Sequence, residues 1–450
     1  MGLVQQNEHN GIAAMRIATI SCALPIIGAG AGGNWLPLLL SEMIADGHEV
    51  FHLLGRGKYA VKEVESNENH RLYTELGATV IPVDLIQDVP QPTALKSTPL
   101  SFLKRMAGIY SHDPALIWPR EIATSKRIAD VLRRLNVDFV VPLAMDGMLL
   151  TWDWQDTPKI AIDAEGPHIN TLIKWRYIPE VPPGPSLAFA KYSYQTWTNY
   201  IRMKNAYLEV LARQDRIFLQ GPHYADWATK NGLKNAIYCA TPVPDFAGDS
   251  WQQDRRQLQE NNQIPQITVV GHLDSTSSQT SLPLLFDEVL PGLLERLGPD
   301  SFHLNIIGRN ERLPARYDHW RTHPAVKFHG AITPLTPSLL SADIILVTVP
   351  GPTGRRMRLV HALSHGCCVV AHQNNHLGLP ELTHGNDVLF GKNGKEIIQM
   401  VINALNDSKL RIRIGNAAHE TFHKHYSSKV RMPVILSNFH HAMTASAKNK

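Results

Sequence analysis

Short apolar runs alternate with longer amphipathic segments from Met15 onward. Runs rich in β-branched residues, such as Lys159–Ile162, are typical of buried strands, and segments with apolar residues three or four positions apart are typical of helices. Their alternation predicts βαβ units and a parallel sheet. In the first half we expect strands at Arg16–Pro25, His48–Leu54, Ala78–Val83, Asp138–Leu143, Lys159–Ile162 and Asp215–Leu219, and helices at Asn34–Asp46, His70–Leu76, Ser125–Leu135 and Tyr200–Arg213.

The same alternation restarts after the turn-rich segment Thr241-Pro-Val-Pro-Asp245. In the second half we expect strands at Ile267–Val270, His303–Ile307, Val326–His329, Ile344–Val347 and Cys367–Ala371, and helices at Leu282–Leu297, Leu335–Leu340, Arg356–His365 and Gly394–Leu405. The fold class is therefore α/β, with two doubly wound, Rossmann-like domains. The expected parts are a flexible tail at 1–14, domains at 15–245 and 246–425, and a C-terminal helix at 426–450 that could pack back on the first domain.

Composition narrows the class of protein. Of 450 residues, 44% are hydrophobic and 19% are charged, which is ordinary for a soluble globular chain and excludes a disordered or collagen-like one. A net charge of +4 is too small to indicate a nucleic-acid partner. Four cysteines are no disulfide framework, and the adjacent Cys367 and Cys368 are expected to be buried in a reducing compartment. We expect a cytoplasmic protein, because the apolar run that begins at Ile17 ends in a glycine cluster, as a first strand would.

The segment 96–134 mixes basic and apolar residues. Such a segment can lie on the inner, anionic face of a membrane. A solvated basic face over a helix core is the alternative.

Glycines follow the first predicted strand in the order Gly28-Ala-Gly30-Ala-Gly-Gly33. This order satisfies the dinucleotide-binding pattern GxGxxG, which also needs an acid at the end of the second strand. That strand runs into Arg56 instead, which could hold a 2′-phosphate, so an NADP-dependent oxidoreductase stays an alternative. Tight strand–helix packing is the other explanation of the glycines. The candidate residues of this loop are Gly30, Gly32, Gly33 and Asn34.

The second half carries a denser set of candidates. Gly271-His272 and Gly308-Arg309 end two predicted strands, where ligands of open α/β sheets bind. Thr353-Gly354-Arg-Arg356-Met-Arg358 then runs from a loop into a helix. Arginines in a first helical turn oppose the helix dipole, so a bound anion such as a diphosphate explains them better than a solvated basic face.

Five segments of the second half follow one another in an order that is typical of a known family. They are Val326-Lys-Phe-His-Gly330, Leu339-Leu-Ser-Ala-Asp343, Thr353–Arg358, His361–Ala371 and Leu377–Phe390. With them the chain resembles the group 1 (family 4) glycosyltransferases of the GT-B fold, over most of residues 265–425. Its first half resembles the family's opening more loosely, at Gly33-Asn-Trp-Leu-Pro37 and Gly47-His-Glu-Val50.

The resemblance implies transfer of a sugar from a UDP- or GDP-linked donor to an acceptor hydroxyl of a glycan, lipid-linked or small molecule. It implies no further cofactor, no metal and a retaining outcome, since Asn34 stands where many inverting relatives have a histidine base. The implied diphosphate ligands are Arg309, Thr353, Gly354, Arg356 and Arg358, the nucleoside and sugar contacts are Gly271, His272, Gly308 and His361, and the catalytic candidates are Asp163, His168 and Glu381.

One departure from the family keeps a second function open. His361 stands where the family has a glutamate that binds the donor ribose, and a neutral histidine accepts only one hydrogen bond. The alternative is therefore a non-catalytic GT-B-like protein that binds a sugar or a partner. Asp163-x-Glu165 is only superficially similar to a metal motif, and His372 and His376 are expected in a loop rather than in a metal site.

Overall fold

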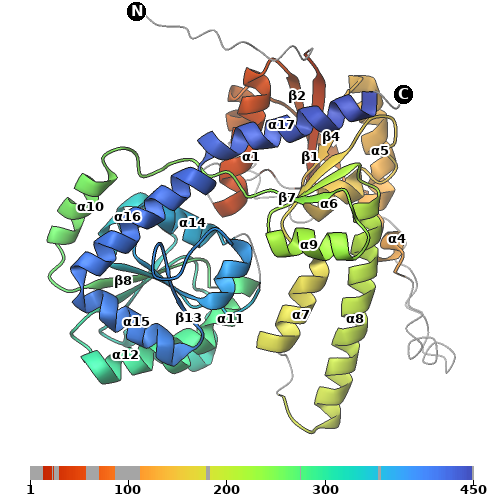
Figure 1. Ribbon diagram of the computed structural model, residues 1–450. Coiled ribbons are helices and arrows are strands. Elements are labelled where there is room, and N and C mark those ends of the chain that lie inside the picture. Colours follow the sequence, from red (N-terminus) through yellow and green to blue (C-terminus); the bar gives the residue numbers. More distant parts are fainter. Residues whose placement is uncertain are drawn as a thin grey trace, which may run out of the picture.

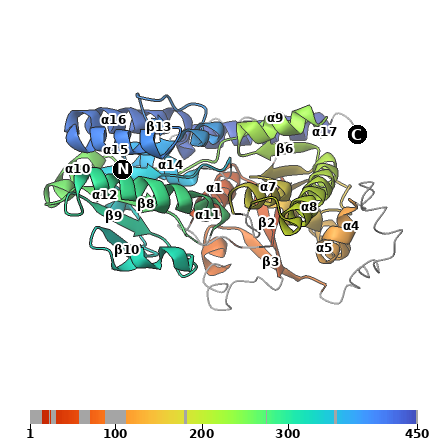
Figure 2. The ribbon, with the colours of Figure 1, turned by 90° about the horizontal axis from the view of Figure 1, so that it is seen from below.

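The computed structural model describes residues 14–22, 24, 30–56, 70–86, 112–178, 183–273, 275–352 and 356–447. Two α/β domains lie side by side, each built on a parallel sheet (Figures 1 and 2).

The first domain has the strand order β3-β2-β1-β4, continued by β5-β6-β7. Parallel bridges from Val140 to Lys159 and from Leu143 to Ile162 join β4 to β5, so the strands form one twisted layer. The strands are β1 (Arg16–Ser21), β2 (Glu49–Arg56), β3 (Thr79–Asp84), β4 (Phe139–Pro142), β5 (Ile160–Asp163), β6 (Arg216–Leu219) and β7 (Ala236–Tyr238). The helices are α1 (Gly30–Ala45), α4 (Pro114–Ile117), α5 (Pro119–Leu135), α6 (Ala144–Leu150), α7 (Pro167–Tyr177), α8 (Leu187–Ala212) and α9 (Pro222–Lys230).

Helix α1 corrects the expected glycine loop. Gly30, Gly32, Gly33 and Asn34 form its first turns, whereas the sequence predicts a loop up to Gly33. Each helical glycine costs up to about 1 kcal/mol relative to alanine, but helix formation is cooperative and most of its stability comes from packing. The later turns supply that packing through the buried side chains of Leu36, Leu39, Leu40 and Met43.

Helices α7 and α8 pack together and project from the first sheet beside the second domain (Figure 1). Helix α8 begins at Leu187, well before the expected Tyr200. Its first half exposes apolar side chains, among them Leu187 and Trp197, so the apolar stripe that marks a buried helix is lacking there.

The second sheet has the order β10-β9-β8-β11-β12-β13 and is parallel throughout. Its order reverses between β8 and β11, as expected of a doubly wound domain, and this reversal is where such sheets bind ligands. The strands are β8 (Gln266–Val270), β9 (His303–Ile307), β10 (Val326–Gly330), β11 (Ile344–Val347), β12 (Val369–His372) and β13 (Leu389–Gly391). The helices are α10 (Trp251–Glu260), α11 (Thr276–Pro283), η1 (Leu284–Val289), α12 (Leu290–Leu297), η2 (Ala315–Thr322), α13 (Thr336–Ser341), α14 (Met357–Ser364), η3 (Gln373–Gly378), α15 (Gly394–Asn406) and α16 (Ser408–His425).

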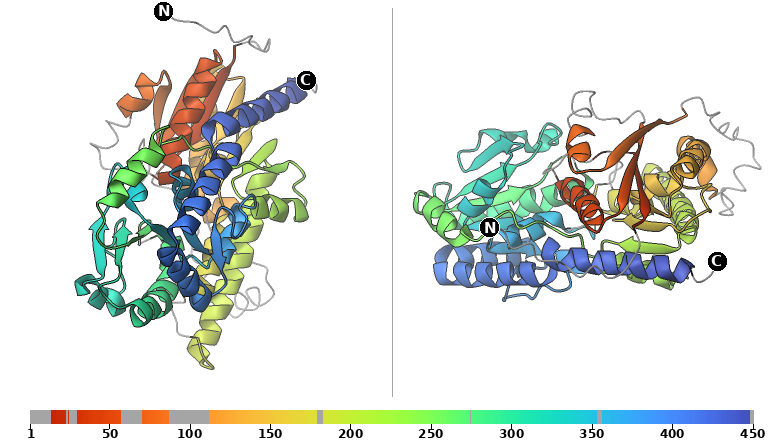
Figure 3. Two further views of the ribbon diagram at one scale, coloured as in Figure 1. Left: turned by 60° about the vertical axis from the view of Figure 1, so that its left-hand side comes forward. Right: turned by 90° about the horizontal axis from the view of Figure 1, so that it is seen from above.

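The chain passes between the domains twice, and the two passages meet. Val243 on the outward connection forms a parallel bridge with Ser427 on the return. Helix α17 (Ser428–Ala447) then lies on the first domain (Figure 3). Its Phe439 ring packs on Phe139 and Phe218, with centroids 5.8 and 5.4 Å apart. The end of the chain thus covers the core of the first domain.

Two cysteines and the apolar character of the helices complete the description of the fold. Cys367 and Cys368 are free thiols inside the second domain, with 0% and 1% of their surface exposed, as expected. Among the described helices, none combines the length and the apolar character that crossing a bilayer requires. The part of segment 96–134 up to residue 111 lies outside the described residues.

Candidate donor-binding site

Two glycines bring the ends of β8 and β9 into close contact. Gly271 and Gly308 have φ angles of +136° and +138°, and a Cβ on Gly308 would overlap the carbonyl oxygen of Gly271. The next residues lock the two strand ends together, since the Arg309 N–H donates to His272 Nδ1 at 3.0 Å. The structure therefore gathers Gly271, His272, Gly308 and Arg309 at the switch point of the sheet, as the sequence predicts.

Arg358 reaches these strand ends from the first turn of α14. A Cβ on Gly271 would lie 2.8 Å from its Nη2 atom, so the guanidinium packs directly against the glycine backbone. Nη2 also donates to Ser278 Oγ at 3.1 Å. Burial lowers the pKa of Arg358 to about 10, which still leaves it charged at neutral pH. Within the described part of the chain, Arg358 has no carboxylate partner.

Arg356 precedes α14 and is 5% exposed. Its backbone has a left-handed φ of +54°, and its Nη2 atom donates to the Gly351 carbonyl at 2.7 Å. Burial lowers its pKa to about 10; the nearby charge of Arg358 acts in the same direction, and the carboxylate of Glu165 acts against it. A buried charge is costly without a compensating partner, so two such arginines mark a place for an anionic ligand. The predicted ligands Thr353 and Gly354 lie outside the described residues.

Helix α11 adds a third source of positive potential. Ser275 caps its N-terminus by accepting a hydrogen bond from the Ser278 N–H at 3.3 Å. Free N–H groups at such a helix end favour anions. Sequence reasoning missed this element, although the serine-rich start that follows Leu273 carries the capping signal.

Tyrosines of the first domain hold the loop that leads to Arg356. The Tyr224 hydroxyl lies 2.9 Å from Glu165 Oε2 and 3.1 Å from the Pro352 carbonyl oxygen. The Tyr177 hydroxyl donates to the Pro350 carbonyl at 3.4 Å. Of these groups, sequence reasoning named only Glu165. The tyrosines carry no local motif, because their partners are distant in the chain.

Asp163 and His168 lie in packed surroundings next to Glu165. The Asp163 carboxylate accepts hydrogen bonds from the Tyr207 hydroxyl and the Ala164 N–H, both at 2.7 Å. His168 is 1% exposed, and its ring stacks on Trp227 with centroids 4.6 Å apart. Burial lowers its pKa to about 4, so the ring is neutral. This geometry favours a supporting role for both residues, and their catalytic role stays a prediction.

Glu381 lies at the crossing of the two interdomain passages. Its carboxylate accepts a hydrogen bond from the Tyr426 hydroxyl at 2.6 Å and pairs with Arg431 at 3.4 Å. Both partners belong to the returning chain, so the structure gives Glu381 a part in holding the domains together. Its expected place near the donor sugar stays a prediction.

His361 lies on α14, one helical turn beyond Arg358. Its ring is parallel to that of Phe246, with an interplanar angle of 8° and centroids 5.6 Å apart. Burial lowers the pKa of His361 to about 4, so it is neutral where the resembled family has a carboxylate. Since Phe246 belongs to the outward connection, that connection contacts α14 beside the candidate site.

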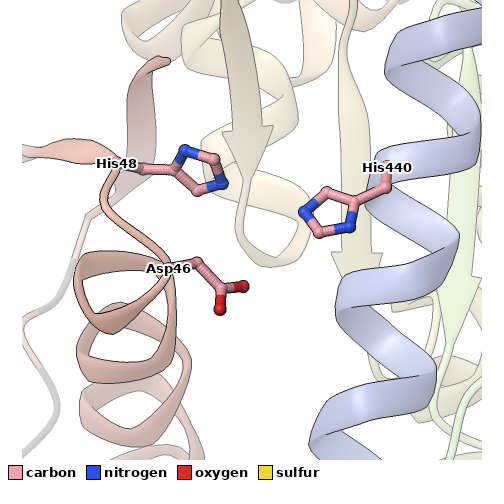
Figure 4. Close-up of side chains that lie close together, drawn as sticks. All are labelled: Asp46, His48 and His440. Atoms are coloured by element: carbon pink, nitrogen blue, oxygen red, sulfur yellow. The ribbon is translucent and has the colours of Figure 1, made fainter. Parts of the chain in front are cut away.

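Two clusters of the described residues have metal-binding side chains. In the first, His48 and His440 face each other above Asp46 (Figure 4). The His48 Nδ1 atom accepts a hydrogen bond from the Met15 N–H at 3.3 Å, so its proton is on Nε2. The second cluster is Asp245, His419 and His423. The sequence predicts His372 and His376 in a loop, but His372 ends β12 and His376 lies in η3, and neither belongs to a cluster.

The chain is similar to known proteins both in part of its sequence and in its fold. Residues 264–407 match the family model described as "Glycosyl transferases group 1". A glycosyltransferase from Rickettsia africae ESF-5 is similar in structure, with a TM-score of 0.60, 13% identity, and coverage of 96% of this chain and 99% of that one. Sucrose-phosphate synthase from Thermosynechococcus elongatus has a TM-score of 0.65 and 12% identity, with 96% and 100% covered.

Anabaena Alr3699/HepE in complex with UDP and glucose has a TM-score of 0.57 and 12% identity, with 94% of this chain and 99% of that chain covered. No curated protein sequence matches the chain. The structural matches confirm the expected GT-B fold over nearly the whole chain, and the family match confirms the resemblance within the second domain.

Proposed function

We propose that this GT-B protein, with its group 1 glycosyltransferase domain, transfers a sugar from a UDP- or GDP-linked donor to an acceptor hydroxyl, with retention and without a metal in the donor site. The observation that carries this proposal is Arg358, a buried guanidinium without a carboxylate partner in the described chain, held against Gly271. The complexes of Alr3699/HepE with UDP and with UDP-glucose support a nucleotide sugar as the class of donor.

The chemistry needs a cationic site at the leaving group. The bond between the anomeric carbon and the diphosphate oxygen breaks, and the diphosphate leaves with the electron pair. The acceptor oxygen bonds to the anomeric carbon and loses its proton. Arg356, Arg358 and the start of α11 are in place before the reaction, so they stabilise the developing charge without reorganisation.

The side chains of the first domain favour retention of the anomeric configuration. Asn34 has no basic group that could take a proton from the acceptor, whereas an inverting mechanism needs such a base. Asp163 and His168 are already engaged in packing and hydrogen bonds, and Glu165 contacts Tyr224 beside the loop before Arg356.

His361 favours one second candidate function. Its neutral ring stacks on Phe246 and can offer one acceptor, so the ribose is held less firmly than by a carboxylate. A chain that binds a nucleotide sugar without turning it over would be a carbohydrate-binding or partner-binding protein. Binding together with neither transfer nor donor hydrolysis identifies that function.

A thermal-shift screen with UDP, GDP, ADP, their sugars and NADP tests the proposal. A ligand at 100 times its Kd stabilises the protein by about 2.7 kcal/mol. We expect a shift with one nucleotide diphosphate that is lost in Arg358→Ala and kept in Arg312→Ala, which removes an exposed arginine. The anomeric configuration of the product, formed with and without EDTA, then tests retention and metal independence. A shift with NADP alone supports the oxidoreductase, and no shift with any nucleotide refutes the donor site.

A further inference from the structure

We infer that Asp245, His419 and His423 form a binding site for a divalent transition metal, with Zn²⁺ as the best fit, which fastens the outward interdomain connection to α16. The site is separate from the donor site and does not depend on the proposed function. Two of its ligands come from one helix, and the third comes from the segment between β7 and α10.

The spacing of the ligand atoms fits a tetrahedral metal. His419 and His423 are four residues apart on α16, so their rings lie on one face of the helix. Their Nε2 atoms are 3.0 Å apart, and His423 Nε2 is 3.3 Å from Asp245 Oδ2. In a tetrahedral zinc site with bonds of about 2.0–2.1 Å, neighbouring ligand atoms lie about 3.3 Å apart. The ligand atoms of the third pair, Asp245 and His419, lie within 4.8 Å of each other, so a side-chain rotation lets all three share one ion.

Hydrogen bonds on the far side of two ligands leave the right atoms for a metal. The His419 Nδ1 atom lies 2.9 Å from the Ser364 carbonyl oxygen, which can only accept, so Nδ1 carries the proton and the Nε2 lone pair faces His423. A carbonyl behind a histidine in this way is the usual support of a metal ligand. Asp245 uses Oδ1 to accept from the Ala247 and Gly248 N–H groups, at 3.1 and 3.3 Å, and leaves Oδ2 directed at His423.

The chemistry of the three side chains and their exposure point to the kind of ion. Two imidazoles and one carboxylate suit Zn²⁺ rather than Mg²⁺ or Ca²⁺, which prefer oxygen ligands. The side chains of His423 and Asp245 are 46% and 26% exposed, so the ion can enter from solvent and water can fill the fourth position. The His423 Nε2 proton lies between two acceptors, His419 Nε2 and Asp245 Oδ2, and it leaves when an ion binds. The cluster of Asp46, His48 and His440 is the other place in the described chain where such an ion could bind.

Because Asp245 lies next to Phe246 in the chain, a bound ion would also restrict the segment that contacts α14. Phe246 directly follows Asp245, and its ring stacks on His361. An ion that fixes Asp245 to α16 therefore also restricts the backbone that holds Phe246 over α14.

Metal titration of the full-length chain tests the inference. Chelator-treated protein is titrated with Zn²⁺ in competition with a chromophoric chelator, and with Co²⁺ to record the absorption bands of tetrahedral coordination. The variants are Asp245→Asn, which keeps the Oδ1 acceptor, and His423→Gln. The matched control is His425→Gln, on the same helix but outside the cluster.

We expect wild type and His425→Gln to bind Zn²⁺ equally. Asp245→Asn and His423→Gln should each lose at least about tenfold in affinity, given that even the outer partners of metal ligands are worth about 10–100-fold. They should also lose the tetrahedral Co²⁺ bands, and their melting temperatures without metal should equal that of wild type. The inference is refuted if wild type binds no ion or if both variants bind as wild type does. It is equally refuted if binding disappears in His440→Gln instead, which assigns the ion to the other cluster.

Discussion

Replacing Arg358 by methionine should make the ligand-free protein more stable and weaken nucleotide binding at the proposed donor site. Burial lowers the pKa of Arg358 from 12.5 to about 10. At about 1.4 kcal/mol for each pKa unit, the folded state carries a penalty of about 3 kcal/mol for this charge. The variant loses the hydrogen bond to Ser278, worth about 1–1.5 kcal/mol, but Ser278 Oγ keeps its contact with Ser275 Oγ at 3.0 Å.

The net gain is about 2 kcal/mol, which corresponds to a rise of about 4–8 °C in melting temperature for a domain of this size. Calorimetric melting without ligand measures this gain, and isothermal titration with the nucleotide diphosphate found in the screen measures the loss of binding. One charged hydrogen bond is worth about 1.5–3 kcal/mol, so we expect binding to weaken about 10–150-fold. Arg312→Met, at an exposed arginine outside the candidate site, is the control; it should change stability by no more than about 0.5 kcal/mol and leave nucleotide binding unchanged. A variant that melts below wild type, or binds as wild type does, would falsify this account of Arg358.

Three further predictions follow from the packing. Gly308→Ala places a Cβ against the Gly271 carbonyl oxygen and should lower the free energy of unfolding in urea by more than about 3 kcal/mol. Gly330→Ala, at φ +70° with no atom within 4 Å of the new Cβ, should lower it only by the backbone strain of about 1 kcal/mol. Equal losses of stability in the two variants contradict the overlap. Burial holds the pKa of His168 at about 4, while the histidine of the unfolded chain protonates near pH 6.5. The stability that the neutral ring contributes is therefore complete above pH 6.5 and is lost as the pH falls towards 4. In His168→Phe the slope of the unfolding free energy against pH should be smaller by up to about 1.4 kcal/mol per pH unit, and an unchanged slope refutes a neutral buried ring. A double-mutant cycle of Tyr426→Phe and Glu381→Leu, each of which removes the hydrogen bond, should give a coupling energy of about 1.5–3 kcal/mol, and additivity would show that their 2.6 Å hydrogen bond adds nothing.

The sequence predicts the strands of the two sheets better than it predicts the start of α8 and the contacts between the domains. Buried strands such as Ile344–Val347 are continuous apolar runs. The glycines that end β8 and β9 let the backbones of the two strands come close together. Gly271 and Arg358 can each be singled out from the sequence, because a strand end and a basic first turn are local signals, but their contact cannot.

The rest depends on contacts that no local pattern carries. The start of α8 has exposed apolar side chains such as Trp197, so its amphipathic pattern is absent. Tyr177 and Tyr224 meet the loop before Arg356 only through the relative placement of the two domains. The four-residue spacing of His419 and His423 is visible in the sequence, but its third partner is Asp245, which is distant along the chain.

The packing of Phe439 on Phe139 and Phe218 sets an order of events during synthesis. The first domain's sheet ends at Tyr238, yet the aromatic ring that closes its core is encoded about 200 residues later, or about 10–40 s at a translation rate of about 5–20 residues per second. Throughout that interval the nascent first domain exposes the surface that α17 later covers. A ribosome that stalls within the second domain thus leaves two unfinished domains rather than one finished and one missing, and the emerging chain offers chaperones the same apolar surface that α17 finally occupies.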